Sequence, residues 1–233
     1  DPGSTMSFEP LTEERIETDS TYDAGTTTQL MWGARSDVGC VRPHNEDSYL
    51  VQSPLFCVCD GMGGHAAGEV ASSIAVETIA KTAPQSADAA RLAAAVEAAN
   101  AAVIEAALNG LGKPGMGCTA TCAYIENDTL AIAHVGDSRA YLLHEGTLIR
   151  VTRDHSYVEE LVDAGEITAD EARVHPNRSV ITRALGSDPA MYADHFTLHI
   201  EEGDRLILCS DGLSSMIPDS DIENIATQSS TAQ

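Results

Sequence analysis

The sequence predicts an α+β domain in which antiparallel strands pack against helices. Short apolar runs bounded by Gly, Pro, Asn and Asp recur along the chain, which is typical of strands joined by tight turns. These runs lie at 30–36, 48–60, 118–152 and 193–209. Two alanine-rich stretches, 69–82 and 89–109, carry apolar residues at helical spacing instead, and such faces suit close packing on a sheet. A chain of 233 residues with 43% hydrophobic residues can bury one sizeable core.

The charge of the chain limits its partners. With 36 acidic against 13 basic residues the formal net charge is −23, and there is no clustered basic footprint. This excludes a nucleic acid or an anionic membrane surface as a partner. Residues 1–25 are acidic, contain few apolar groups and hold Arg15 as their one base, so we expect a disordered tail there and a folded domain over 26–233.

The compartment follows from two negative observations. No apolar run approaches the roughly 20 residues needed to cross a bilayer, and no signal peptide is visible. We therefore expect a cytoplasmic protein without membrane contact. The six cysteines lie mostly in apolar runs and include no CxxC pair, which favours buried free thiols over disulfides or a zinc site. The Cys-x5-Arg pattern of cysteine phosphatases is absent.

A glycine-rich turn after the apolar run 55–59 presents the first candidate site residue. The run predicts a buried strand, so Asp60 would lie where a sheet opens to solvent. Gly61 and the glycines after it let a ligand approach the backbone closely, and a carboxylate beside an exposed carbonyl suits a hard cation. An ordinary strand-to-helix turn is the alternative for this stretch by itself.

A predicted hairpin adds two further carboxylates. Strands over 48–52 and 55–60, separated by a turn, would bring Glu46 and Asp47 near Asp60. Three carboxylates in one place repel one another unless a divalent cation neutralises them. The alternative is an exposed acidic turn.

The second half of the chain predicts an antiparallel meander and a flap. Asp137 lies in a tight turn of the meander, where forming an Asx turn is the commonest role of an aspartate. Asp211 follows a later strand, over 205–209, and is followed by a glycine just as Asp60 is. The polar insertion 154–183, with two short helical pieces, is expected to form a flap beside the site.

These acidic groups together predict phosphate-ester hydrolysis. Carboxylates without His or Cys partners select Mg²⁺ or Mn²⁺ over zinc. Ions that share a carboxylate lower the pKa of a bound water and orient it for in-line attack at phosphorus. Arg42 could then hold the phosphate by two parallel hydrogen bonds. The full set is Glu46, Asp47, Asp60, Asp137 and Asp211 with Arg42.

At these positions the sequence resembles the bacterial metal-dependent Ser/Thr protein phosphatases, the PPM family or protein phosphatase type 2C. The resemblance lies in seven ordered motifs that span about three quarters of the chain. They are S-D-x-G-x-x-R-x-x-N-E-D (36–47), V-C-D-G-M-G-G-H (58–65), G-C-T-A (117–120), V-G-D-S-R-A-Y (135–141), T-R-D-H-S (152–156), R-A-L-G (183–186) and C-S-D-G-L (209–213).

The resemblance implies an α-β-β-α sandwich, two packed antiparallel sheets flanked by helices, and a role for each site residue. Asp60 would bridge two Mn²⁺ or Mg²⁺ ions and Gly61 would give its carbonyl oxygen. Asp211 would bind one ion, and Glu46 and Asp47 would bind the ions or their waters. A weaker third ion would lie between Asp137 and Asp211, Arg42 would bind the phosphate, and 154–183 would be the family's variable flap. Implied partners are phosphorylated proteins and the Ser/Thr kinases that produce them.

Two departures from the family pattern matter. Met62 stands where many eukaryotic members have a histidine proposed as general acid, which leaves His65 as a candidate for substrate contact or proton donation, or for a merely local hydrogen bond. A late Asp-Asn motif and a closing strand of the family are also not found after Asp211. We therefore expect a truncated chain without the final strands, impaired in catalysis and able to associate through an exposed sheet edge. A catalytically silent binding module is the alternative function; a kinase is disfavoured because no phosphate loop with its lysine is present.

Overall fold

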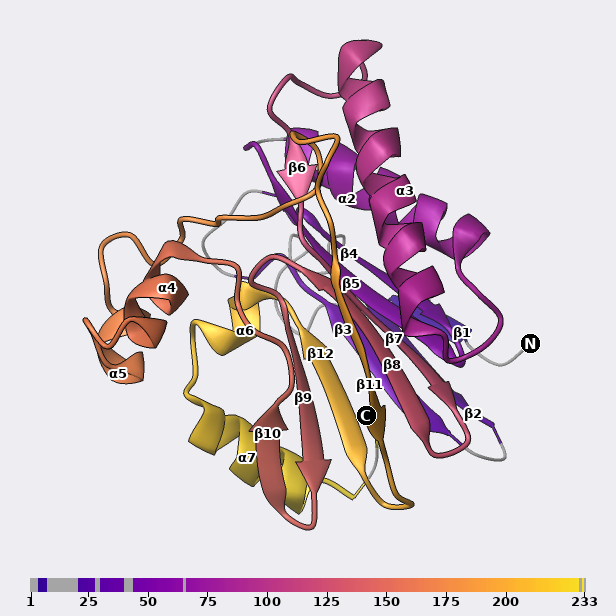
Figure 1. Ribbon diagram of the computed structural model, residues 1–233. Helices are drawn as coiled ribbons and strands as arrows, with labels where there is room; N and C mark the ends of the chain where they lie inside the picture. Colours follow the sequence, from indigo (N-terminus) through magenta and orange to yellow (C-terminus); the bar gives the residue numbers. More distant parts are fainter. Residues whose placement is uncertain are drawn as a thin grey trace.

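The computed structural model describes residues 4–7, 21–27, 30–39, 44–64, 66–230 and 232. Within these residues the strands form three antiparallel sheets, and helices cover the outer faces of two of them (Figure 1).

The largest sheet has six strands in the order β11-β8-β7-β5-β4, with β6 paired to the end of β5. Its strands are β4 (Asp47–Gln52), β5 (Leu55–Met62), β6 (Gly117–Cys118), β7 (Ala120–Glu126), β8 (Thr129–Val135) and β11 (Asp194–His199). A tight turn joins β7 to β8 through Asn127, whose φ of 53° is a left-handed conformation that asparagine tolerates. The predicted hairpin of β4 and β5 is confirmed, and its register places Asp47 opposite Asp60.

Two helices, α2 (Ala66–Thr82) and α3 (Ala89–Leu108), cover one face of this sheet (Figure 1). α3 begins after Asp88, whose side chain accepts a hydrogen bond from the backbone N–H of Arg91 and so pairs one of the free donors of the first turn. The predicted apolar stripe is confirmed, because its members are fully buried against the sheet. They are Leu92, Val96, Ala99 and Val103.

A smaller sheet packs on the other face, with the order β10-β9-β12. Its strands are β9 (Arg139–His144), β10 (Thr147–Arg150) and β12 (Arg205–Cys209). Successive side chains of β12 point to opposite faces of the small sheet, so the two faces have different contacts. Leu206 and Leu208 pack with the core of the large sheet, whereas Ile207 and Cys209 pack on the opposite side.

The outer face of the small sheet is covered by α7 (Asp219–Gln228), which follows the short helix α6 (Asp211–Ser214). Ile222 of α7 is buried against Tyr141 and Cys209. The layers therefore run from α2 and α3 through the large and small sheets to α7, and the predicted α-β-β-α sandwich is confirmed.

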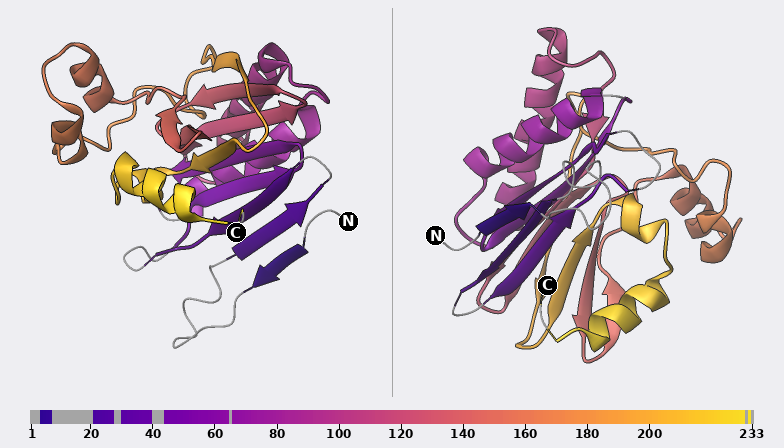
Figure 2. Two further views of the ribbon diagram at one scale, coloured as in Figure 1. Left: turned by 90° about the horizontal axis from the view of Figure 1, so that it is seen from below. Right: turned by 180° about the vertical axis from the view of Figure 1, so that it is seen from behind.

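The third sheet consists of β1 (Ser4–Ser7), β2 (Thr21–Thr26) and β3 (Met31–Ser36). It lies at the margin of the molecule, away from α2 and α3 (Figure 2). Here the structure differs from the expected disordered tail over 1–25, because the described parts of that segment pair their backbones with the neighbouring strand. An edge strand such as β3 offers unpaired backbone groups that a polar segment can bind.

The predicted continuous meander is wrong between β8 and β9. The turn after β8 carries the chain from the large sheet to the small one, and the link from β11 to β12 does the same. Gly136 makes the first crossing with a φ of 106°, a conformation that favours glycine. Asp137 therefore lies between the two sheets. Asp211 lies near it, because Cys209 pairs with Arg139 in the β12–β9 register.

The predicted flap leaves the sandwich at its edge and contains α4 (Tyr157–Asp163) and α5 (Ala169–Arg173), seen at the left of Figure 1. Ser156 caps α4, and Thr168 forms a capping box with Glu171 at the start of α5. In the part of the chain that the structure describes, every helix is too short or too polar to cross a bilayer. The described cysteines are buried and free, as predicted; Cys40 lies outside the described residues.

Candidate metal centre

Asp60 lies near the end of β5 and is only 6% exposed. Its backbone N–H donates to Oγ1 of Thr119 at 3.0 Å, and the N–H of Thr119 donates to the carbonyl of Asp60 at 2.9 Å. Oγ1 of Thr119 also lies 2.6 Å from Oγ of Ser138, the residue after Asp137. This buried group therefore fixes Asp60 relative to the turn between the two sheets.

Most of the predicted site residues meet in one cavity of about 450 Å³. It is lined by Glu46, Asp60, Gly61, Asp137 and Asp211, together with His44, Met62, Gly64, Ser179 and Ile181. Asp47 stands beside them, opposite Asp60 in the β4–β5 register, and its Oδ2 accepts a hydrogen bond from Oγ of Ser210 at 2.8 Å. Arg42 and His65 lie outside the described residues, so their predicted roles stay predictions.

Glycines let the backbone close around the carboxylates. A Cβ built on Gly61 would lie 2.1 Å from the carbonyl oxygen of Gly68, and one on Gly68 would lie 2.8 Å from Oε2 of Glu46. The Gly61 N–H donates to the carbonyl of Glu46 at 3.1 Å. Glycine at both positions is thus required for the N-terminal turn of α2 to approach β5 and hold Glu46 between them.

The electrostatics of the cavity are unfavourable without a cation. Burial, followed by the neighbouring Asp211 and Asp47 carboxylates, raises the pKa of Asp60 to about 11. Burial, followed by Asp211 and Asp154, raises the pKa of Asp137 to about 7. No ion pair with a Lys or Arg joins Asp60 or Asp211 within the described ranges.

The residues fit a hard divalent ion. Oδ1 of Asp137 is buried and finds no hydrogen-bond partner among the residues that the structure describes, and a buried unpaired carboxylate oxygen is costly unless an ion binds it. Three other side chains of the cavity wall, on Glu46, Asp60 and Asp211, offer carboxylate oxygens, while His44 adds an imidazole. Oxygen donors of this kind suit Mg²⁺ or Mn²⁺ rather than zinc.

Sequence reasoning did not find every residue of the site. Thr119 was part of a quoted motif but received no role, and Ser138 received none either; both are fully buried. A buried polar side chain next to a charged turn is the only signal that could have indicated them. Ser179 and Ile181 place the flap in the cavity wall, in agreement with the predicted position of 154–183.

The sequence model of protein phosphatase 2C matches residues 33–233. The chain belongs to the protein phosphatase 2C family. It is 43% identical over 205 residues to the serine/threonine protein phosphatase PstP of Mycobacterium tuberculosis, which covers 85% of this chain but 39% of PstP. The chain thus spans well under half the length of that relative. It is 38% identical over 203 residues to the serine/threonine phosphatase Stp of Listeria monocytogenes, covering 82% of this chain and 81% of Stp.

Solved structures of the family have the same fold. The crystal structure of M. tuberculosis PstP/Ppp superposes with a TM-score of 0.77 at 38% identity, over 92% of this chain and 87% of that one. The catalytic domain of PstP in complex with two manganese ions gives a TM-score of 0.75 at 36% identity with the same coverage. In this protein phosphatase 2C chain the buried carboxylates therefore occur on a fold that binds manganese in a close relative.

Proposed function

We propose that this chain is a Mn²⁺- or Mg²⁺-dependent protein phosphatase that hydrolyses phosphoserine and phosphothreonine. The observation that carries the proposal is the buried Asp60 carboxylate, which faces Asp47 and Asp211 without a Lys or Arg partner among the described residues. Burying several carboxylates in one place is costly, and a bound divalent cation offsets that cost. The names of the relatives, serine/threonine phosphatases, support the choice of reaction.

The side chains have distinct tasks in this proposal. Glu46, Asp47, Asp60 and Asp211, with the carbonyl of Gly61, would hold two ions, and Asp137 and Asp211 would hold a third. Bound ions would lower the pKa of a water and orient it for in-line attack at phosphorus.

Two residues outside the described ranges complete the proposal. Arg42 binds the phosphate by two parallel hydrogen bonds. His65 contacts the substrate or donates a proton.

The flap contributes to substrate choice. Ser179 and Ile181 line the same cavity as the carboxylates, so a bound phosphopeptide would contact 154–183. We assign the catalytic domain to 26–233 with this flap as an insertion. The proposed partners are cytoplasmic phosphoproteins and the Ser/Thr kinases that phosphorylate them.

We also propose that two chains associate. Within the described residues β12 pairs on one side only, with β9. A second cavity of about 690 Å³ lies beside its other edge, lined by apolar groups of β3 and β12 such as Trp32, Leu206 and Leu208. Light scattering after gel filtration tests this: a monomer at all concentrations would contradict it.

The activity test is hydrolysis of a phosphothreonine peptide with and without Mn²⁺. We expect Mn²⁺-dependent turnover that falls more than about 100-fold in Asp60→Asn, since even the outer partners of metal ligands are worth about 10–100-fold. Asp128→Asn, which changes an exposed carboxylate in the β7–β8 turn, is the matched control and should be fully active.

The alternative function gives a different result in the same experiment. A folded wild-type chain that binds phosphopeptide but shows no turnover at any Mn²⁺ concentration would contradict the enzyme and support the silent binding module.

A further inference from the structure

His155 lies at the start of the flap and has no role in the chemistry described above. Its side chain is 3% exposed and bonded at both nitrogens. The backbone N–H of Gly136 donates to Nδ1 at 2.9 Å, so the ring carries its proton on Nε2, which donates to Oδ2 of Asp194 at 2.8 Å. Burial also lowers the pKa of His155, in agreement with a neutral ring.

His155 holds the peptide groups on both sides of Gly136. Besides the bond from its N–H to the imidazole, the carbonyl of Gly136 accepts the backbone N–H of His155 at 2.9 Å. A Cβ on Gly136 would lie 2.6 Å from Cγ2 of Thr119, so the turn already touches its neighbour on the other side. The turn is therefore clamped between Thr119 and His155.

Asp137 follows directly and depends on this clamp. Its Oδ1 is buried and has no hydrogen-bond partner in the described part of the chain. No hydrogen bond to another described residue fixes that oxygen, so its position depends on the backbone of the turn. A shift of Gly136 would move the carboxylate out of the cavity that it shares with Asp211.

The other face of His155 is tied to the end of the flap. Asp194 binds Nη1 of Arg183 at 2.7 Å, and the Arg183 guanidinium lies 4.2 Å from the centre of the Tyr192 ring. The N–H of Thr182 donates to the carbonyl of His155 at 2.9 Å. His155 is thus the point where the start of the flap, its end and the Asp137 turn are joined.

A second histidine keeps the imidazole in place. The rings of His134 and His155 lie 5.0 Å apart. His134 is itself fixed, because Nε2 donates to the carbonyl of Arg153 at 2.9 Å and Nδ1 lies 2.9 Å from Oγ1 of Thr121. Burial lowers its pKa to about 4, so His134 stays neutral as well.

We propose that His155 is a positioning residue which holds the Gly136–Asp137 turn in its ion-binding place and couples that place to the position of the flap. It does not line the cavity, and it acts through Gly136 on one side and through Asp194 and Arg183 on the other. The inference rests on the proposed function for its effect on turnover but not for its effect on the turn.

The turn is tested first in the metal-free protein by hydrogen exchange of the Gly136 amide, measured by NMR. His155→Leu keeps the volume and removes the acceptor, and we expect the amide to exchange about tenfold faster, the factor that one lost hydrogen bond produces. His155→Asn presents an oxygen where Nδ1 was and should restore most of the protection. Equal exchange in all three proteins would overturn the proposal.

The effect on ions is tested by titrating Mn²⁺ against phosphopeptide hydrolysis. In His155→Leu the Mn²⁺ concentration for half-maximal activity should rise about 10–100-fold, the usual effect of removing a support of a metal ligand. KM for the peptide at saturating Mn²⁺ should stay the same, and His155→Asn should recover much of the loss. His195→Asn, an exposed histidine on the same strand as Asp194, is the matched control and should behave as wild type. An unchanged Mn²⁺ requirement in a folded His155→Leu protein would overturn the coupling.

Failure of the proposed function and failure of the positioning role of His155 give different results. Absence of Mn²⁺-dependent turnover in the wild type would contradict the proposed function, while the Gly136 exchange would still decide the positioning role. Should His155→Leu not fold, Asp194→Ala at a partly exposed position leaves Nε2–H without its acceptor and should speed Gly136 exchange several-fold. Wild-type exchange in that variant would overturn the proposal.

Discussion

Acidic clusters lie at both ends of the same pair of strands, β9 and β12. At one end Asp137 precedes β9 and Asp211 follows β12; at the other end His144 closes β9 and Asp204 precedes β12. At the metal centre Asp60 and Asp137 are buried, and Asp60 and Asp211 have no Lys or Arg partner among the described residues.

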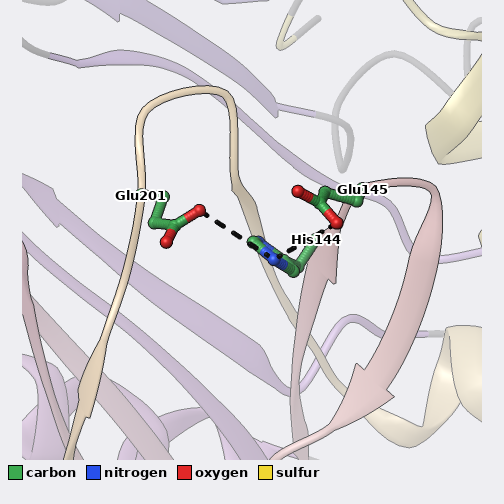
Figure 3. A group of neighbouring side chains, drawn as sticks. All are labelled: His144, Glu145 and Glu201. Atoms are coloured by element: carbon green, nitrogen blue, oxygen red, sulfur yellow. Dashed lines mark ion pairs between the residues drawn. The ribbon is translucent and has the colours of Figure 1, made fainter.

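The far end of the two strands also has the residue types of a metal site, but the charges of its carboxylates are compensated differently. His144 faces Glu145 and Glu201 with Nε2 at 3.9 and 4.0 Å from their carboxylates (Figure 3). Nδ1 lies 2.6 Å from Oδ1 of Asp204, and this carboxylate raises the pKa of His144. Glu145 is 84% exposed, so water already compensates its charge. The difference teaches that crowded carboxylates demand an ion only where burial removes water and no protein cation replaces it.

The largest expected effect that separates the two ends is the response of stability to Mn²⁺. At a Mn²⁺ concentration about 100 times Kd, the free energy of unfolding should rise by about 2.7 kcal/mol over the protein in EDTA, measured by thermal melting. Asp211→Asn should lose most of this increase, and His144→Gln should keep it. A Mn²⁺ response that depends on His144 would break the comparison.

The second-largest effect should come from removing the Thr119 hydroxyl, which supports Asp60. Thr119→Val keeps the shape but leaves the buried N–H of Asp60 unpaired, so the free energy of unfolding should fall by about 1–3 kcal/mol in urea titrations. Thr129→Val, at the start of β8 where the hydroxyl is not fully buried, should change it by less than about 0.5 kcal/mol. Equal losses in the two variants would show that burial of the Thr119 hydroxyl is unimportant.

The far cluster should give the smallest effect, visible as a pH dependence. Because the folded pKa of His144 is raised above the unfolded value of 6.5, folding favours the protonated ring. Its stabilisation is therefore fully present below that unfolded pKa and is lost as the pH rises through the folded pKa. Urea midpoints of wild type and His144→Gln at acidic and alkaline pH should converge at the alkaline end; a constant difference would contradict this.

Much of the sandwich could be predicted because its signals are local. The strand over 205–209, the stripe on α3 and the turn residues between strands each depend on a few neighbouring positions, and the structure has them as expected. The hairpin that brings Asp47 opposite Asp60 was predictable for the same reason.

The parts of the fold and the site that were not predicted depend on contacts between segments that are distant in the sequence. Turn residues at Gly136 indicate a reversal of the chain but not which sheet receives the next strand, so the crossing from β8 to β9 was missed. Thr119 and His155 resemble ordinary strand and loop residues, and only their placement against Asp60 and Gly136 shows what they hold. The strands within the acidic segment also require pairing with β3, and the composition of the segment does not reveal that pairing.

The origin of the ligands in two different layers has a consequence for the order of unfolding. Asp60 lies on β5 of the large sheet and Glu46 directly precedes β4, whereas Asp211 follows the last strand of the small sheet. An ion shared by these carboxylates must be released before the two sheets can separate. Saturation with Mn²⁺ should therefore lengthen the lifetime of the whole sandwich, which makes the centre a kinetic lock on the domain.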